Sequence, residues 1–432
     1  MEFFNRLGER LEQEWRAKDF NEELFPALAA EALKSACLPE KYTAWQVLEW
    51  TLEQTELPRQ RDVKASFGDP PITIYSAPRF HIDVYFWFQG TTSIHQHAFC
   101  GAFQVMHGSS IHSWYEFEVQ DAVNVFCEIG EMRLKSCELL NVGDIQPILP
   151  GRQYIHSLFH LDHPSATIVI RTDKSPLHLP QYDYQKPGLA LDPFFGLDET
   201  TKKLQTVTAL YSASRPEADS LVTKWLESAD FQTTFIILSQ IRNHHASNNL
   251  EQMFGGTESL DRFNSFLELA EKRHGARADI FRRVFAYHER IGDLIRRRNF
   301  VDNPEHRFFF ALLLNVDGRE RIISLIRDRF PDADPIEKIL DWTYELSQMR
   351  LAGTNNQNAL GISPFDDFDL QLVEYLLKGR SDGEIAEIIR QIYPAEKAEQ
   401  VLPTLEDRTA AIRNSIVFSP FLSGANQNIP VN

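Results

Sequence analysis

The chain has 432 residues, 43% hydrophobic and 24% charged, which excludes a disordered or fibrous protein and leaves room for two or three domains with substantial cores. Its formal net charge of −17 argues against nucleic acid or an anionic membrane as the main partner. Four cysteines without a CxxC pair, no signal peptide and no apolar run of about 18 residues together predict a cytoplasmic protein.

Residues 1–60 predict an N-terminal helical segment. Leu7, Leu11 and Trp15 recur at helical spacing and share one face. The stretch LPRQRDVKASFGDPP then interrupts the pattern with three prolines and a glycine, which is typical of a connector.

Residues 61–178 change to a period of two, which predicts a β-barrel or sandwich domain. Its segments are short, rich in β-branched and aromatic residues, and separated by turn formers: ITIYSA, FHIDVYFWFQ, AFQVMHG, IHSWYEFEV, AVNVFCEIG, MRLKSCEL and SATIVIRT. The Pro-rich residues 179–199 are expected to form a linker.

Residues 200–422 return to the helical period, with helix starts indicated at Pro304 and at Asp334-Pro335. Two stretches, 313–331 and 376–394, resemble each other at a fixed offset of 63 residues. They indicate either stacked helical hairpins or ordinary antiparallel packing. Residues 423–432 are expected to be a loose tail, so the whole chain is assigned to the α+β class.

Three histidines in the strand-rich domain form a candidate metal site. His95 and His97 are two residues apart, so both side chains point to the same face of a strand. His156, after the Pro150-Gly151 turn, is the expected third ligand, with Tyr154 on its face. His107 has the opposite strand parity to Gln104 and is expected to face outward.

The spacing of these residues resembles the paired motifs of the cupin superfamily, over about residues 72–175. The first motif corresponds to Gly90, His95, His97 and Gly108, and the second to Gly143, Pro150-Gly151, His156 and His160. The resemblance implies a small β-barrel that holds one metal ion, with His160 in a structural role or behind the ligands.

The usual glutamate ligand of cupins is missing, because Ala102 stands at its position and Gln104 is the nearest polar side chain on that strand. Cupins with three histidines and no glutamate resemble the thiol dioxygenases. That resemblance implies Fe(II), O2 and a small-molecule substrate, with a thiol as one candidate. Gln104 and Tyr154 are then expected to contact substrate or ligands.

Thiol dioxygenases carry a histidine and a tyrosine 15 and 17 residues after the third ligand, which is His156 in this resemblance. Here these positions hold Arg171 and Asp173, which are expected to share one strand face. Arg171 is a candidate anchor for a carboxylate through its planar guanidinium, and Arg79 is another.

Two other functions are compatible with the same residues. A redox-neutral lyase or isomerase would use Zn, Ni, Mn or Cu in place of iron. A ligand-binding barrel would have no turnover and would use its helical domain to bind a protein partner or form a homodimer. The Glu-x-x-His pair Glu271/His274 occurs only once and is therefore not expected to form a di-iron site.

Overall fold

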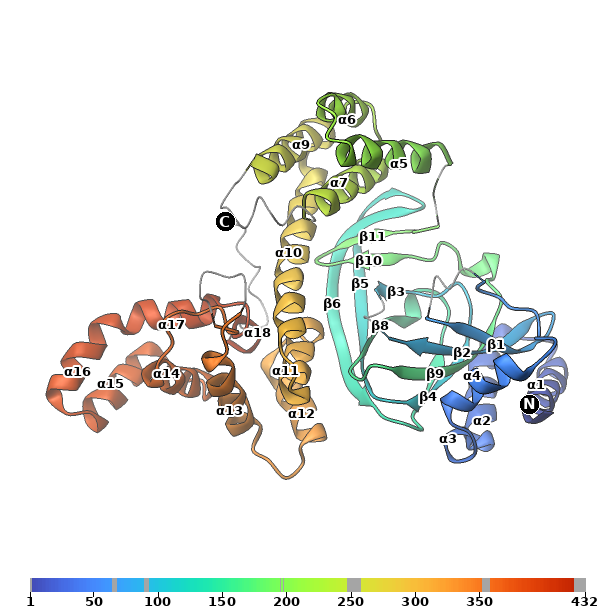
Figure 1. The fold of residues 1–432 in the computed structure, drawn as a ribbon, viewed down its shortest axis with the longest axis horizontal. Coiled ribbons are helices and arrows are strands. Elements are labelled where there is room, and N and C mark those ends of the chain that lie inside the picture. The colour runs from blue at the N-terminus through green and yellow to red at the C-terminus, as the bar shows by residue number, and fades with distance from the viewer. Residues whose placement is uncertain are drawn as a thin grey trace.

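The computed structural model describes residues 2–63, 68–88, 93–194, 196, 198–246, 258–351 and 358–422. Within these ranges the protein is a mixed helix and sheet structure built around a closed six-stranded antiparallel β-barrel (Figure 1). The expected α+β class and β-barrel are thereby confirmed. Gly90 of the first motif and the expected tail 423–432 lie outside the described residues.

Eleven strands in the described part of the chain form two antiparallel sheets. The five-stranded sheet has the order β1 (Pro71–Ser76), β2 (Phe80–Trp87), β9 (Ser165–Thr172), β4 (Gly101–His107), β7 (Ile145–Ile148). The barrel has the order β10 (Asp183–Gln185), β11 (Leu189–Leu191), β6 (Cys127–Leu140), β5 (Ser110–Asn124), β8 (Ile155–His160), β3 (Ile94–His95). The two sheets enclose a cluster of aromatic and aliphatic side chains, including Phe103, Leu158 and Val169.

The strands differ from the sequence prediction in two respects. The three expected segments between residues 111 and 139 merge into the long hairpin β5–β6. The expected linker 179–199 is wrong in part, because residues 183–185 and 189–191 form β10 and β11, which close the barrel between β3 and β6. Each of these strands is only three residues long, too short for an alternating pattern to be recognised in sequence.

Gly188 lies in the turn between β10 and β11, where the backbone of β6 approaches closely. A Cβ atom at this position would lie 1.9 Å from the carbonyl oxygen of Gly130, and Gly130 donates a 2.9 Å backbone hydrogen bond to Gly188. Gly188→Ala is therefore expected to lower the free energy of unfolding by about 3 kcal/mol, measured by urea denaturation.

The control for this prediction is Gly292→Ala in a helix, where an added Cβ meets no atom within 4 Å. That substitution is expected to leave stability unchanged or raise it by up to about 1 kcal/mol. Equal urea midpoints for the two variants would show that the close approach at Gly188 is not needed for the fold.

The N-terminal helices cover the outer face of the five-stranded sheet (Figure 1). Phe4, Leu11 and Trp15 are buried in one cluster with Ile82 and Val84 of β2, so the apolar face predicted for the first helix is the face that packs. The helices are α1 (Glu2–Arg16), α2 (Phe25–Ala36), α3 (Leu38–Lys41) and α4 (Ala44–Glu53).

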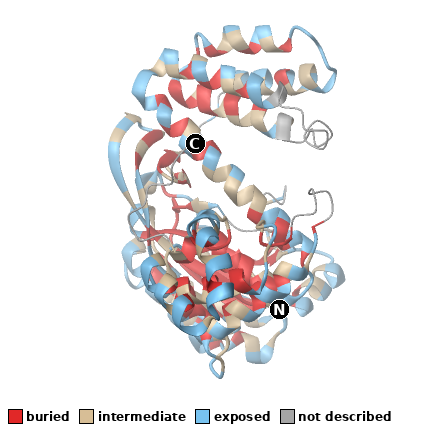
Figure 2. Ribbon diagram, turned by 90° about the vertical axis from the view of Figure 1, so that its left-hand side faces the viewer, coloured by how far each residue is buried: buried red, intermediate tan, exposed pale blue. Residues whose placement is uncertain are grey.

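The C-terminal helices form two groups joined by the long helix α10, which runs beside the barrel (Figure 1). Buried residues concentrate inside the barrel and on the inner helix faces, and exposed residues lie on the outer surfaces (Figure 2). The helices are α5 (Asp198–Ser212), α6 (Ala218–Leu226), α7 (Phe231–Ala246), α9 (Glu258–His274), α10 (Asp279–Phe300), α11 (Pro304–Asn315), α12 (Arg319–Arg329), α13 (Pro335–Gln348), α14 (Asp367–Leu377), α15 (Asp382–Ile392), α16 (Ala395–Val401), α17 (Leu405–Asn414) and α18 (Ser419–Leu422).

The helical part is continuous with the barrel rather than separate from it. Ile111 of β5 and Phe159 of β8 belong to the same buried cluster as Phe308 of α11. An ion pair of 2.6 Å between Lys186 and Asp317 joins the β10–β11 turn to the segment before α12. The helices therefore cover the outside of the barrel on the side of β5 and β8.

Several local predictions for the helices are confirmed. Asn303 and Asp334 cap helices α11 and α13, each directly before a proline. Each of the two similar stretches contains the end of one helix, a turn and a second helix, formed by α11–α12 and α14–α15. None of the helices in the described part of the chain has the length and apolar character that a membrane crossing requires.

Candidate metal centre

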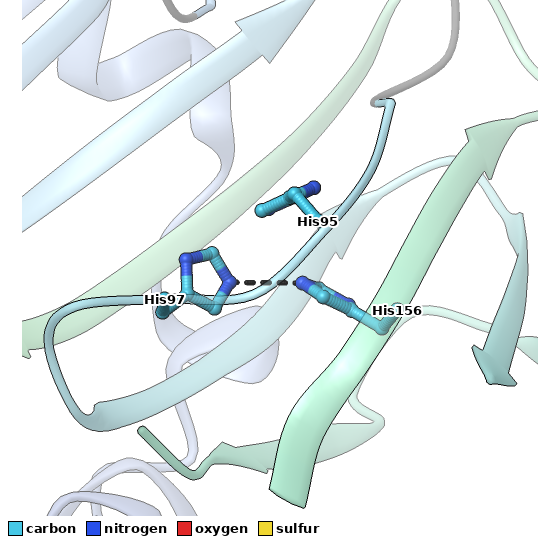
Figure 3. Close-up of side chains that lie close together, drawn as sticks. All are labelled: His95, His97 and His156. Carbon is cyan, nitrogen blue, oxygen red and sulfur yellow. Dashed lines mark hydrogen bonds between the residues drawn. The ribbon is translucent and has the colours of Figure 1, made fainter. Parts of the chain in front are cut away.

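Three buried histidines converge inside the barrel (Figure 3). His95 lies on β3 and pairs in register with His156 of β8, and His97 follows two residues after His95. Their exposed fractions are 6%, 5% and 5%. One ring nitrogen from each histidine lies within 4.8 Å of the others, so the group predicted from the sequence is brought together and could hold a metal ion.

Hydrogen bonds orient the three rings. The Nδ1–H group of His95 donates to the carbonyl oxygen of Ser93 at 2.7 Å, which leaves Nε2 with the lone pair. His97 Nε2 lies 2.8 Å from His156 Nε2, and His156 Nδ1 lies 2.8 Å from His112 Nε2. The contacts of His95 Nδ1 and His156 Nδ1 are the secondary kind that fixes the tautomer of a metal-binding histidine, whereas His97 Nε2 and His156 Nε2 are two facing candidate ligand atoms.

The turn at Pro150-Gly151 ties the two motifs together. Gly151 has a φ angle of 68°, which favours glycine, and its backbone N–H donates a 2.8 Å hydrogen bond to the carbonyl oxygen of His97. The neighbouring Gln96 is held by Tyr184, whose hydroxyl donates to its side-chain oxygen at 2.5 Å. The backbone that carries His97 is therefore fixed on both sides.

Burial determines the charge of this cluster. Burial lowers the pKa of His95, and it lowers the pKa of His97 and His156 well below the ordinary value of 6.5. A protonated His95 and the Arg171 guanidinium would each lower the pKa of His97 further. All three imidazoles are therefore neutral near pH 7, which is the form that binds a metal.

The separation of the ligand nitrogens suits a shared ion. Two nitrogens that are each about 2.0–2.1 Å from one metal, at a right angle, would lie about 2.9 Å apart. The corresponding atoms of His97 and His156 are 2.8 Å apart. Neutral imidazole suits Fe, Cu, Ni and Zn, so the donor set fits a transition metal without selecting one.

Two further side chains complete the group. Tyr154, expected beside His156, lies 4.6 Å from its ring centroid, and its hydroxyl is 3.4 Å from His112 Nε2. His112 of β5 is the residue that the sequence reasoning missed. The face of β5 that carries its side chain becomes clear only from the pairing of β5 with β8, where Trp114, two residues later, lies opposite His156.

Two of the expected site residues do not reach the histidines. Gln104 lies on the same face of β4 as Ala102 and Met106, which pack toward the N-terminal helices, and its Nε2 donates to the carbonyl of Gly143 at 3.0 Å. Arg79 is exposed in the β1–β2 turn, with its guanidinium 4.5 Å from the ring centroid of Phe20. Strand parity and turn placement direct both side chains away from the three histidines.

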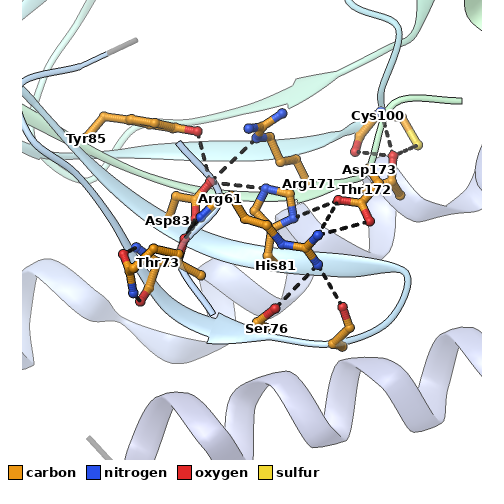
Figure 4. Close-up of polar contacts among 12 residues, drawn as sticks. Arg61, Thr73, Ser76, His81, Asp83, Tyr85, Cys100, Arg171, Thr172 and Asp173 are labelled. Atoms are coloured by element: carbon orange, nitrogen blue, oxygen red, sulfur yellow. Dashed lines mark hydrogen bonds and ion pairs between the residues drawn. The ribbon is translucent and has the colours of Figure 1, made fainter. Parts of the chain in front are cut away.

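Arg171 and Asp173 do not share a strand face, because β9 ends at Thr172 (Figure 4). Arg171 lies over the ring of Phe99 at 4.5 Å, and its Nε is 3.6 Å from a carboxylate oxygen of Asp83. Asp173 lies outside the barrel interior and forms a 3.3 Å ion pair with Arg61. Arg171 is thus near the ring that packs on His97 but is already paired with a carboxylate.

The remaining histidines have other contacts. His160 stacks on Trp87 with ring centroids 4.7 Å apart, and its Nδ1 lies 2.7 Å from the hydroxyl of Ser165. This supports the structural alternative for His160. His107 is exposed at the end of β4, as expected, but because the strand register shifts between Val105 and His107 and not because Gln104 faces the barrel interior.

The Glu271/His274 pair does not form a shared site. Glu271 pairs with Arg282, and His274 Nε2 lies 2.9 Å from the hydroxyl of Thr234. The prediction that this Glu-x-x-His match is accidental agrees with these separate partners.

The fold and the site together define a helix-flanked β-barrel protein with a buried three-histidine cluster. The sequence matches no protein-family model, and no curated protein was found to be similar to it.

Proposed function

We propose that His95, His97 and His156 hold one Fe(II) ion and that the barrel is a cupin-type mononuclear non-haem iron oxygenase. Its proposed substrate is a small molecule, with thiols as the first class to test. The observation that carries the proposal is the convergence of three neutral, buried imidazoles with no carboxylate among them. Three neutral ligands leave the full charge of the ion available to a bound thiolate.

An iron ion held by three protein ligands would offer open positions for substrate and O2. The residues of the chain would position the ligands and exclude water. Ser93 orients His95, and the ring of Phe99 lies 4.3 Å from that of His97. Phe103 and Tyr154 add apolar surface around the cluster.

An open groove of about 610 Å³, lined by residues of β5, β6 and the segment 146–155, is the proposed place for substrate to approach the barrel, although the three histidines do not line it. Trp114 lines this groove and also packs on His112, with ring centroids 3.9 Å apart. Glu138, Gln146 and Arg152 supply polar groups to the same groove. We infer that substrate binds here first, with Trp114 between the groove and the histidines.

The proposal is tested on the wild-type protein by its metal content and its O2 uptake. Roughly one iron per chain is expected after anaerobic reconstitution with Fe(II), together with O2 consumption when small thiols such as cysteamine are added. His95→Ala is expected to lose both, because the ring that Ser93 orients is removed.

The other outcomes separate the alternatives. One zinc or nickel per chain, with turnover that does not need O2, would favour a redox-neutral cupin lyase or isomerase. No metal in the wild type, even after reconstitution, would exclude both enzymes and leave a ligand-binding barrel, with the helical domain as the surface for a protein partner.

A further inference from the structure

A fourth buried histidine, His112, contacts His156 at the ring nitrogen that does not face His97. His112 lies on β5 with an exposed fraction of 0%, and its Nε2 is 2.8 Å from Nδ1 of His156. Its ring is held between Trp114, at 3.9 Å, and Phe103, at 5.7 Å between centroids. The contact is therefore part of a packed arrangement and not a flexible surface pair.

The position of one proton decides whether His156 can bind a metal. A neutral imidazole carries its proton on one nitrogen only, so a lone pair on His156 Nε2 requires the proton on Nδ1. His112 Nε2 is placed to accept that proton in a hydrogen bond. The opposite direction, with His112 donating, would put the proton on His156 Nε2 and block coordination.

We propose that His112 is a positioning residue of the metal site: its Nε2 accepts a hydrogen bond from His156 Nδ1–H and holds His156 Nε2 in the metal-binding tautomer. This inference rests on the proposed function of the three histidines. In this role His112 contacts neither metal nor substrate. It serves His156 Nδ1 as a hydrogen-bond acceptor, as the carbonyl oxygen of Ser93 serves His95 Nδ1.

The surroundings of His112 favour this role over a purely structural one. Within the described ranges, its Nδ1 is buried without a hydrogen-bond partner. A buried polar atom without a partner destabilises the fold, so an apolar side chain of similar shape would serve packing better. The histidine at this position is accounted for by its Nε2, for which His156 Nδ1 at 2.8 Å is a closer partner than the Tyr154 hydroxyl at 3.4 Å.

The test compares the Zn(II) affinity of three variants with that of the wild type, by competition with a chromophoric chelator. His112→Phe keeps a ring but removes the acceptor, and is expected to weaken Zn(II) binding by about 10–100-fold. His112→Gln places a side-chain oxygen where it can accept the same hydrogen bond, and is expected to recover most of that loss. The control, His160→Gln, alters another buried histidine of the barrel that does not touch the cluster and should bind Zn(II) like the wild type.

Each outcome decides the question. Wild-type affinity in His112→Phe, or no recovery in His112→Gln, would overturn the role of His112 while leaving the metal site intact. A wild type that binds no Zn(II), Co(II) or Fe(II) would overturn the metal site and this inference together.

A second measurement needs no variant and remains decisive if the substituted proteins do not fold. Long-range ¹H–¹⁵N spectra of histidine-labelled, zinc-loaded wild type should show the proton of His156 on Nδ1 and the lone pair of His112 on Nε2. A proton on His112 Nε2 would contradict the inference.

Discussion

His97→Ala is expected to abolish stoichiometric metal binding. In the proposed site His97 would contribute one of three ligand nitrogens, with its Nε2 2.8 Å from that of His156. Among the described residues, no other His, Cys, Asp or Glu belongs to this cluster. The loss of affinity should exceed the roughly 10–100-fold that removal of an outer hydrogen-bond partner causes. Elemental analysis after reconstitution and chelator competition measure this effect.

The matched control is His107→Ala. His107 is ten residues further along the chain, exposed at the end of β4 and outside the cluster, so its removal takes away an imidazole without touching the site. Its metal content should equal that of the wild type. Equal metal content in His97→Ala and wild type would show that these histidines do not form the binding site.

The three histidines could be predicted because their convergence depends on few assumptions. Two side chains at positions i and i+2 share a strand face whatever the strand pairs with. The Pro150-Gly151 turn, with its φ angle of 68° at the glycine, was also recognisable from local sequence. Such features are set within a few residues and bring the three histidines together, although β3 ends at His95 and His97 reaches the cluster from the segment just after the strand.

The side-chain positions of the residues around the histidines could not be predicted, because they depend on contacts between segments far apart in the sequence. Gln104 faces the N-terminal helices because β4 packs its even-numbered positions there, which only the packing of α2 on the sheet reveals. Asp173 leaves the strand because β9 ends one residue earlier. His112 joins the site through the register of β5 with β8, and alternation in SSIHSWYEF could not define it because aromatic residues occupy both faces.

Acidification is expected to destabilise the metal-free protein strongly. Burial lowers the pKa of His112 and His160 from 6.5 to about 3, so in the folded state both stay neutral where the unfolded chain is protonated. Between those pH values the unfolded chain binds more protons than the folded chain. The contribution of these histidines to the free energy of unfolding is therefore fully present above pH 6.5 and falls as the pH is lowered toward 3. At pH 5 each of these histidines should lower the free energy of unfolding by about 2 kcal/mol relative to its value above pH 6.5.

Urea unfolding of metal-free protein at pH 7.5 and pH 5 measures this loss. His160→Gln removes one of these buried titrating groups and should reduce the decrease by about 2 kcal/mol, whereas His107→Gln, at an exposed position, should not. Saturating Zn(II) should add stability at pH 7.5 that disappears on acidification, since protons and metal compete for the same nitrogens. An equal urea midpoint at both pH values would mean that these histidines are not held neutral by burial, and the case for three neutral ligands would fail with it.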